Sequence, residues 1–433
     1  MKPHGRKVAI LGGARIPFAR QNTAYATLSN HDMLTAALKA VVDKFQLHGE
    51  RLGEVAAGAV LKFSRDFNLT REAALSSGLA PETPAYDVQQ ACGTSLETTL
   101  LVGSKIALGQ IECGVAGGVD TASDAPIGVS EGLRKILLEA NRAKTAAARL
   151  KALAKFRPRD LVPLIPAVNE PRTRLSMGQH CELMAQEWNI AREEQDRLAF
   201  ESHQKAARAY DEGFYADLVV PYAGLTRDNN LRPDTSLEKL ATLKPAFDKK
   251  SGRGTLTAGN STPLTDGASA VLLASEEWAA ARGLKPQAFL VAYETAAVDF
   301  AGAKKEGLLM APAYAVPRLL ARVGLRLQDF DYYEIHEAFA AQVLCTLKAW
   351  SDPRFCKEKL GLDKPLGEIE RDKLNVKGGS LALGHPFGAT GTRIVATLSK
   401  LLAQHREKTG GGGRGLISIC AAGGLGVTAI LES

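Results

Sequence analysis

Apolar residues occur in two patterns along the first 120 residues. Continuous apolar runs lie at residues 8–11, 55–61 and 113–119, whereas residues 31–43 and 71–79 repeat apolar positions at intervals of three and four. Continuous runs are typical of strands buried on both faces, and the second spacing is typical of helices that cover a sheet. This part of the chain is therefore predicted to be an α/β sheet with helices on both faces.

The pattern changes between residues 121 and 250. Residues 131–159 contain nine basic and two acidic residues and are predicted to form a basic amphipathic helix or helix pair. Residues 177–215 keep helical spacing, residues 221–250 are mostly loop, and strand-like runs return at 254–260 and 268–274. We therefore expect three parts: an N-terminal half (1–120 and 251–285), an inserted, mainly helical loop domain (121–250), and a C-terminal half (286–433).

The C-terminal half repeats the pattern of the N-terminal half. Residues 375–391 lead into a helix expected near Thr392, as residues 87–94 lead into a helix after Cys92, and His385 is matched with Cys92. Residues 416–431 read as strand, glycine turn and strand. Two similar halves that pack about a pseudo-twofold axis would bring equivalent loops together. We therefore expect Cys92, His385 and Cys420 to converge.

Composition narrows the class of protein. The chain has 433 residues, 45% of them hydrophobic, and no apolar run long enough to span a bilayer. Its six cysteines lie far apart without a CxxC pair, so we expect no metal site, no disulfide framework and a reducing compartment. The basic run at residues 1–7 leads directly into a strand, which argues against a signal peptide. The net charge of +7 suits an anionic ligand, but no nucleic-acid-reading motif accompanies it.

Cys92 is the first candidate for chemistry. It is expected at a helix N-terminus, where free backbone N–H groups and the helix dipole favour a thiolate, the nucleophilic form of cysteine. For a single cysteine, a small buried structural thiol is the alternative. Structural roles are likewise the alternatives for His385 and His336.

Five motifs extend this picture over the whole chain: Gln90-Ala-Cys92-Gly-Thr-Ser, Asn260 with Asp266-Gly-Ala, His336-Glu-Ala-Phe-Ala, Gly384-His385-Pro-Phe-Gly-Ala-Thr-Gly391 and Cys420-Ala-Ala-Gly-Gly-Leu-Gly426. Each motif alone is weak. Together, and in this order, they resemble the thiolases. The resemblance implies a layered α-β-α-β-α architecture of two duplicated βαβαβ halves, and cleavage of 3-ketoacyl-CoA by CoA in fatty-acid β-oxidation.

The resemblance also implies the catalytic roles. Cys92 would be the nucleophile that carries the acyl group, His385 its base, and Cys420 the residue that exchanges a proton with C2 of acetyl-CoA and then with CoA. The backbone N–H groups of Cys92 and Ala422 would form one oxyanion hole. A second hole would use His385 and a water held by His336. Most of the family has asparagine at that position, whereas histidine is found in the β-subunits of fatty-acid oxidation trifunctional complexes.

Substrate-binding residues are implied less specifically. Ser261 and Thr262 occupy the place of a family serine beside the pantetheine, and Met177 lies in a loop that shapes the acyl pocket. Arg253, preceded by Lys249 and Lys250, is a candidate for the phosphates of CoA, although a solvated basic loop is the alternative. Ser176 stands where many short-chain biosynthetic thiolases have histidine, which argues against acetoacetyl-CoA specificity.

The predicted function is that of a 3-ketoacyl-CoA thiolase, with CoA as a substrate and no permanently bound cofactor. A biosynthetic acetoacetyl-CoA thiolase and a non-catalytic CoA-binding subunit are the alternatives. The expected partners are acyl-CoA, CoA, a second copy of the chain in a homodimer or larger assembly, and a hydratase/dehydrogenase α-subunit. We expect a cytoplasmic protein with no nucleic-acid partner. Segment 131–159 is expected to contact an anionic membrane or that α-subunit, and a solvated helical face is the alternative.

Overall fold

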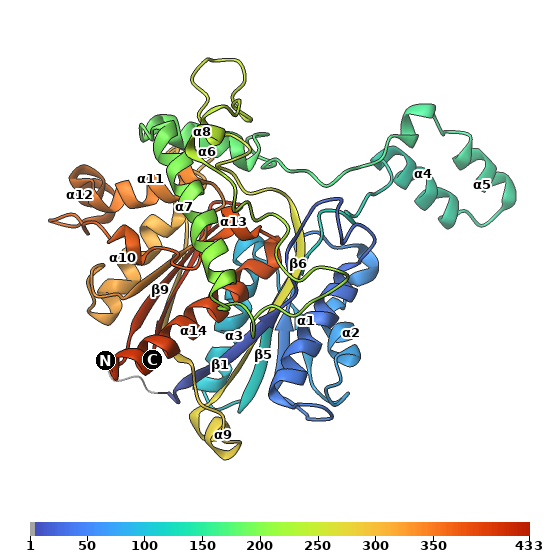
Figure 1. The fold of residues 1–433 in the computed structure, drawn as a ribbon. Helices are drawn as coiled ribbons and strands as arrows, with labels where there is room; N and C mark the ends of the chain where they lie inside the picture. Colours follow the sequence, from blue (N-terminus) through green and yellow to red (C-terminus); the bar gives the residue numbers. More distant parts are fainter. Residues whose placement is uncertain (1–4) are drawn as a thin grey trace.

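The computed structural model describes residues 5–433 (Figure 1). Residues 1–4, the first part of the basic N-terminal run, lie outside the described residues. The strands are β1 (Val8–Arg15), β2 (Ala19–Arg20), β3 (Glu54–Ala57), β4 (Ala85–Asp87), β5 (Cys113–Asp120), β6 (Thr265–Ser275), β7 (Ala288–Ala297), β8 (Tyr332–Ile335), β9 (Arg414–Ala421) and β10 (Leu425–Glu432).

The α-helices alternate with these strands. They are α1 (Asn30–Phe45), α2 (Leu69–Ser76), α3 (Thr94–Ala107), α4 (Glu131–Arg142), α5 (Ala146–Leu153), α6 (Met177–Glu187), α7 (Arg192–Asp211), α8 (Leu237–Ala241), α9 (Glu276–Ala281), α10 (Ala311–Val323), α11 (Ala340–Ser351), α12 (Pro353–Leu360), α13 (Ser380–Leu383) and α14 (Thr390–Thr409). Short 3-10 turns, Ala91–Gly93 and Phe387–Ala389, immediately precede α3 and α14.

The strand order reveals the duplication. The strands follow one another as β4-β3-β5-β6-β1-β7-β10-β9-β8, with β2 paired to β6. Going outward from the central antiparallel β1–β7 pair, β6 and β10 are antiparallel to their inner neighbours, and so are β5 and β9. Next, β3 is parallel to β5 and β8 is parallel to β9. The two halves are therefore related by a pseudo-twofold axis through the β1–β7 pair.

Alternating side chains assign the strands to layers. In β1, Val8 and Ile10 belong to the hydrophobic core around α3 and α14, whereas Ala9 and Leu11 belong to the core beneath α1. Successive side chains of a strand point to opposite faces, so each face of the sheet covers a different core. The C-terminal half packs α10 and α11 over its outer face. The predicted α-β-α-β-α architecture is confirmed, with α3 and α14 in the middle layer (Figure 1).

The middle layer joins the halves through a close contact between α3 and α14. The backbone N–H of Thr392 donates to Ser95 Oγ at 2.9 Å. A Cβ atom on Gly391 would lie 2.1 Å from the backbone nitrogen of Leu96, so only glycine allows this approach. The turns that precede the two helices are consequently held beside each other.

The segment between β5 and β6 divides into two regions. Helices α6 and α7 pack against the body, whereas α4 and α5 project from it on two extended connections (Figure 1). We call residues 127–168, which contain α4 and α5, the arm. Among residues 5–433, no helix is both long and apolar enough to cross a membrane. The expectation of a basic helix pair is confirmed.

One strand prediction is wrong. Residues 254–260 form a loop, because side chains rather than a neighbouring strand accept their backbone N–H groups. Glu182 accepts from Thr255 at 2.8 Å and from Leu256 at 3.0 Å, and Asn260 Oδ1 accepts from Thr257 at 2.7 Å. Thr255 and Thr257, whose alternation predicts a strand, therefore lie in a loop whose backbone N–H groups bond to side chains.

Candidate functional site

Cys92 lies in the 3-10 turn that precedes α3. Ala91, just before it, has a φ of 47°, which is uncommon for a residue with a side chain. The Thr94 hydroxyl stabilises the turn, since it donates to the Ala91 carbonyl at 2.8 Å and accepts the Gln90 N–H at 2.9 Å. Cys92 is partly exposed and is the only one of the six cysteines that is not buried.

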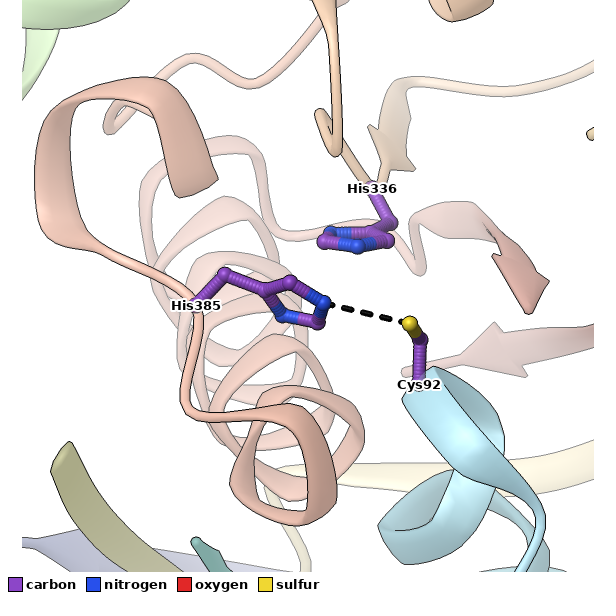
Figure 2. Close-up of side chains that lie close together, drawn as sticks. All are labelled: Cys92, His336 and His385. Atoms are coloured by element: carbon purple, nitrogen blue, oxygen red, sulfur yellow. Dashed lines mark hydrogen bonds between the residues drawn. The ribbon is translucent and has the colours of Figure 1, made fainter. Parts of the chain in front are cut away.

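His385 reaches Cys92 from the opposite half of the molecule. Its Nε2 lies 3.2 Å from Cys92 Sγ (Figure 2). Its Nδ1 lies 2.6 Å from Thr390 Oγ1. The Thr390 hydroxyl donates its proton to the Pro386 carbonyl at 3.1 Å, so it accepts from Nδ1–H. This leaves the lone pair of Nε2 directed at the Cys92 thiol.

Although Cys92 is partly exposed, loss of hydration in the site keeps both members of this pair neutral. It lowers the pKa of His385 to about 3, helped by the positive charge of Arg393. It raises the pKa of Cys92 to about 12, although the backbone N–H groups of Ala422 and Cys92 itself oppose the change. The expectation that the helix N-terminus makes Cys92 a thiolate is therefore wrong for the resting site, because desolvation outweighs these N–H groups.

The match between His385 and Cys92 is also wrong by three residues. Cys92 lies two positions before Thr94, the first residue of α3, whereas His385 lies five positions before Thr390, the first residue of α14. Gly388 occupies the position equivalent to Cys92. The convergence of Cys92 and His385 therefore comes from the crossing of two unequal loops.

His336 forms the third side of the site. It follows β8, is completely buried, and lies against His385 with ring centroids 4.2 Å apart and ring planes tilted by 50° (Figure 2). Its Nδ1 lies 2.9 Å from Ser380 Oγ. Donor atoms of Cys92, His336 and His385 lie within 4.8 Å of one another, an arrangement that could hold a metal ion. The hydrogen bond between the thiol and His385 engages two of these atoms.

Cys420 lies at the end of β9, and the loop after it approaches Cys92. Cys420 is buried, and burial together with the nearby Cys92 raises its pKa well above the usual value of a thiol. The Ala422 N–H points at the sulfur of Cys92. Glu170, at the base of the arm, accepts the N–H of Gly423 at 2.7 Å and so holds this loop. Hence residues 420–423 supply both a thiol and a backbone donor near Cys92.

The expected substrate-binding residues lie at different depths. Ser261 is buried beside Phe339, and its Oγ has no hydrogen-bond partner among residues 5–433. Thr262 donates to the Ala338 carbonyl at 3.0 Å through its hydroxyl. Met177 begins α6 and packs against the core of the C-terminal half. Arg253 is exposed in a loop, and the structure records no contact between it and the Cys92–His385–His336 cluster.

Several supporting residues escaped the sequence analysis. Asp120, at the end of β5, accepts backbone N–H groups from Val60, Leu61 and Gly388, and burial raises its pKa to about 7. Arg393 is buried, and its Nη2 lies 2.8 Å from Ser380 Oγ. For Asp120 the available sequence signal was a charged residue directly after an apolar strand-like run. For Arg393 it was a charged residue among small residues at a helix start.

Comparisons with known proteins agree over the whole chain. Residues 8–277 match the family model described as thiolase, N-terminal domain, and residues 284–433 match that of the thiolase C-terminal domain. The chain is 42% identical to a 3-ketoacyl-CoA thiolase of Serratia proteamaculans and 43% identical to one of Shewanella loihica. Each alignment covers 99% of this chain and 97% of the relative.

Solved structures show the same similarity. Human mitochondrial 3-ketoacyl-CoA thiolase superposes with a TM-score of 0.79 at 29% identity, and 99% of each chain is covered. A complex of the human enzyme with CoA gives the same score and identity, over 99% of this chain and 98% of the human one. The acetyl-CoA acetyltransferase of Bacillus anthracis also scores 0.79 at 29% identity, over 100% of both chains.

Proposed function

The chain belongs to the thiolase family, and we propose that Cys92, His385, Cys420 and His336 carry out its 3-ketoacyl-CoA thiolase reaction through an acyl-cysteine intermediate. The observation that carries this proposal is the 3.2 Å contact between Cys92 Sγ and His385 Nε2. It places a nucleophile and a base within reach of each other at a point where two halves of the chain meet.

In the first half of the reaction, His385 Nε2 takes the thiol proton while Cys92 Sγ attacks C3 of the 3-ketoacyl-CoA. A neutral pair suits this step, because proton transfer during the attack creates the thiolate only when the substrate is present. The C2–C3 bond then breaks. Cys420 gives its proton to C2 of the departing enolate, which leaves as acetyl-CoA, and the acyl group remains on Cys92.

In the second half, the Cys420 thiolate takes the proton of the incoming CoA thiol, and the CoA sulfur attacks the acyl carbonyl. Cys92 leaves as the thiol when His385 returns its proton. The product is an acyl-CoA shortened by two carbons, so CoA is a substrate rather than a resident cofactor. Backbone N–H groups of Cys92 and Ala422 would stabilise the oxyanion on the Cys92-bound carbon. His336 and His385 would serve the enolate oxygen of acetyl-CoA through a water.

Ser261, Thr262, Met177 and Arg253 are our candidates for binding the acyl-CoA. Buried Ser261 has an unpartnered hydroxyl, which supports a role beside the polar part of the pantetheine. Arg253 and the adjacent Lys249 and Lys250 lie in an exposed basic loop, where a phosphate could be neutralised without burial of the charge. Arg253→Ala should raise KM for CoA and leave kcat unchanged, and a change in kcat alone would contradict this assignment.

The acyl intermediate can be tested directly. Mass spectrometry after brief incubation with a 3-ketoacyl-CoA, in the absence of free CoA, should find the acyl group on the peptide that contains Cys92. Cys113→Ala is a matched control, since Cys113 is a buried strand residue in the same half. Acylation of any other cysteine in the native protein would overturn the mechanism.

The role of Cys420 requires a separate experiment. Cys420→Ser should still be acylated at Cys92 by simple acyl donors, but exchange of the C2 protons of acetyl-CoA with deuterated water should be strongly suppressed. Normal exchange would exclude Cys420 as the residue that moves this proton. Cys356→Ser, a buried cysteine hydrogen-bonded to backbone carbonyls, provides the control.

The arm supports a proposal about partners. Its large hydrophobic side chains are unusually exposed: Ile127, Val129, Leu137, Leu138, Leu150, Leu153, Phe156, Leu161, Val162, Leu164, Ile165 and Val168. Basic residues lie among them, and Arg142, Lys144, Arg149, Lys151, Arg157 and Arg159 form no ion pair with residues 5–433. Apolar residues interspersed with unpaired cations favour an anionic membrane surface, with a hydratase/dehydrogenase subunit as the other candidate.

Replacing residues 127–168 by a short glycine-serine linker tests the arm. Sedimentation with phosphatidylglycerol vesicles should be lost, and sedimentation with phosphatidylcholine vesicles should be weak for both proteins. Retained vesicle binding, together with unchanged binding of the α-subunit, would reject the arm as a docking surface. If only α-subunit binding is lost, the membrane is the wrong partner. The linker should retain Asn169 and Glu170 so that the contact with Gly423 survives.

Assembly, location and substrate range complete the proposal. The outer side of β4 ends the strand order, and this free edge supports a homodimer or larger assembly, which light scattering can test. All six cysteines are free, which supports a cytoplasmic, reducing location.

Higher turnover of 3-ketohexadecanoyl-CoA than of acetoacetyl-CoA would support the degradative role. The reverse preference would favour the biosynthetic role. The division into an N-terminal half (1–120 and 251–285), an inserted loop domain (121–250) and a C-terminal half (286–433) remains a prediction.

A further inference from the structure

His336 presents a buried ring nitrogen that the fold leaves without a partner. The ring is completely buried, and its Nε2 has no hydrogen-bond partner among residues 5–433. The same ring lies against the ring of His385 and beside the Cys92 sulfur. A buried polar atom without a hydrogen-bond partner costs free energy unless a ligand or water bonds to it. Whether this nitrogen carries a proton decides whether it can donate to that ligand or accept from it.

The protonation follows from the groups around Ser380, the first residue of α13. Arg393 Nη2 lies 2.8 Å from Ser380 Oγ, and a guanidinium can only donate. The Ser380 oxygen therefore accepts from Arg393. Its own proton has one acceptor within hydrogen-bond distance in the described chain, namely His336 Nδ1 at 2.9 Å. With Nδ1 accepting, a neutral His336 carries its proton on Nε2.

His385 has the opposite arrangement. Thr390 accepts a proton from its Nδ1, because the Thr390 hydroxyl is already donating to the Pro386 carbonyl. The Nε2 of His385 is consequently unprotonated and faces Cys92. Two neighbouring imidazoles are thus held in opposite tautomers by two hydroxyl groups, one that donates and one that accepts.

Arg393 determines in which direction the Ser380 hydroxyl donates its proton. It is buried, and its Nη1 lies 3.7 Å from Glu334 Oε2. If an acceptor replaced the guanidinium, the Ser380 proton could turn toward it. The neutral ring of His336 could then carry its own proton on Nδ1. The permanent donor therefore fixes the direction in which the hydroxyl points.

We propose that Ser380 and Arg393 are positioning residues that hold His336 in the Nε2–H tautomer, so that its N–H donates to an oxygen atom of a water or acyl-CoA beside Cys92. The inference rests on the proposed function of the Cys92–His385 pair for its catalytic meaning. The tautomer itself can be measured without turnover. In this form His336 is a hydrogen-bond donor, and it has no free lone pair on Nε2 with which to bind a metal ion.

The first test is NMR of protein labelled with ¹⁵N-histidine, with the His336 signals identified by their loss in His336→Gln. In the native protein, His336 should show a protonated Nε2 and an unprotonated Nδ1, and His385 should show the reverse. Ser380→Ala should shift His336 toward the Nδ1–H form, and Ser380→Thr should retain the native form. A native His336 protonated on Nδ1 would overturn the proposal, whatever the stability of the variants.

The second test is kinetic. Ser380→Ala should lower kcat by about 10-fold to 100-fold with little change in KM, because a misdirected donor loses part of the stabilisation that an oxyanion donor provides. Ser380→Thr should restore most of kcat. Ser418→Ala is the matched control, since Ser418 is buried, its carbonyl accepts the His336 backbone N–H, and its hydroxyl has no partner in residues 5–433. It should leave kcat unchanged.

A failure of the acyl-cysteine mechanism and a failure of the positioning role of Ser380 give different results. Absence of an acyl group on Cys92 in the native protein would reject the proposed mechanism and leave the tautomer measurement valid. Normal acylation combined with an unchanged His336 tautomer and unchanged kcat in Ser380→Ala would reject the positioning role alone. Equal losses in Ser380→Ala and Ser418→Ala would likewise reject it, because the effect would then reflect packing behind the ring.

Discussion

The turns before α3 and α14 have the same construction and different chemistry. Each is a 3-10 turn followed by a threonine that begins the helix, and in each the threonine hydroxyl donates back to the turn, to Ala91 at 2.8 Å or to Pro386 at 3.1 Å. In the first turn this hydroxyl accepts a backbone N–H from Gln90, whereas in the second it accepts Nδ1–H from His385. A hydroxyl that stabilises one turn therefore orients a base in the other.

The surroundings of the turns differ in a complementary way. The turn of Cys92 packs beside the end of β9, where the Ala422 N–H points at the sulfur. The turn of His385 packs beside the end of β5, where Asp120 accepts the Gly388 N–H at 2.6 Å. A backbone donor thus faces the nucleophile, and a carboxylate anchors the turn that carries the base. The pseudo-twofold axis explains how both turns reach one site, and the local contacts explain why their roles differ.

The largest effect should come from removing the base from the second turn. His385→Gln keeps a polar side chain but cannot accept a proton from Cys92 near neutral pH. We expect kcat/KM for thiolysis to fall by about 10²–10⁴-fold, the usual contribution of a general base. His48→Gln, which changes an exposed histidine, should have no effect. A loss below tenfold would mean that Cys92 is activated by some other group.

How far the sequence could predict this comparison depends on the kind of interaction. Apolar periodicity located β1, α1 and β5, because a buried strand or helix face needs several apolar residues in a regular pattern. It could not set the register between the Cys92 and His385 turns, since glycine-rich loops carry little periodic signal. The register depends on close approach at Gly388, where an added Cβ would lie 2.5 Å from the Val119 carbonyl.

The chemistry showed a similar limit. The motifs identified Cys92, His385, Cys420 and His336 as candidates, and the structure brings Cys92, His385 and His336 into one cluster. The ionisation of Cys92 was predicted wrongly, because a helix start can be recognised from the sequence whereas the depth of burial around a side chain cannot. The hydroxyl of Ser380 was missed for a related reason: its role depends on Arg393, which is close only after folding.

The second prediction concerns the packing of the two turns. Gly388→Ala should lower the free energy of unfolding by about 1–3 kcal/mol, because the new methyl group would overlap the Val119 and Gly58 carbonyls. Gly411→Ala is a suitable control, since the nearest atom there, Thr409 Oγ1, would be 3.8 Å from the added Cβ. Chemical denaturation of both variants measures the difference. Equal stability of the two would show that the turn before α14 can relax around the added methyl group.

The third prediction separates the two threonines. Thr390→Val should lower kcat about tenfold, because His385 loses the acceptor for its Nδ1–H and with it the hydrogen bond that orients the ring. Thr94→Val should instead act mainly on stability, by about 1–2 kcal/mol, since it leaves the Gln90 N–H without its acceptor. Thr390→Ser should restore activity. If both valine variants lose activity and stability in the same proportion, the two hydroxyls have the same role and the comparison fails.

The smallest effect is a pH dependence that distinguishes the Cys92 thiol, which desolvation keeps protonated, from a free thiol. The pKa of Cys92 is about 12 in the folded chain, and an unfolded cysteine has a pKa of about 8.5. Between these values the unfolded chain has lost a proton that the folded chain retains, so the contribution of Cys92 to stability decreases as pH rises. The difference in unfolding free energy between the native protein and Cys92→Ser should therefore become less favourable to the native protein above pH ~8.5. Alkylation of the Cys92 peptide by iodoacetamide should keep accelerating over the same range. A plateau near pH ~8.5 would instead show a thiol that ionises as if in water, and the neutral pair with His385 would have to be abandoned.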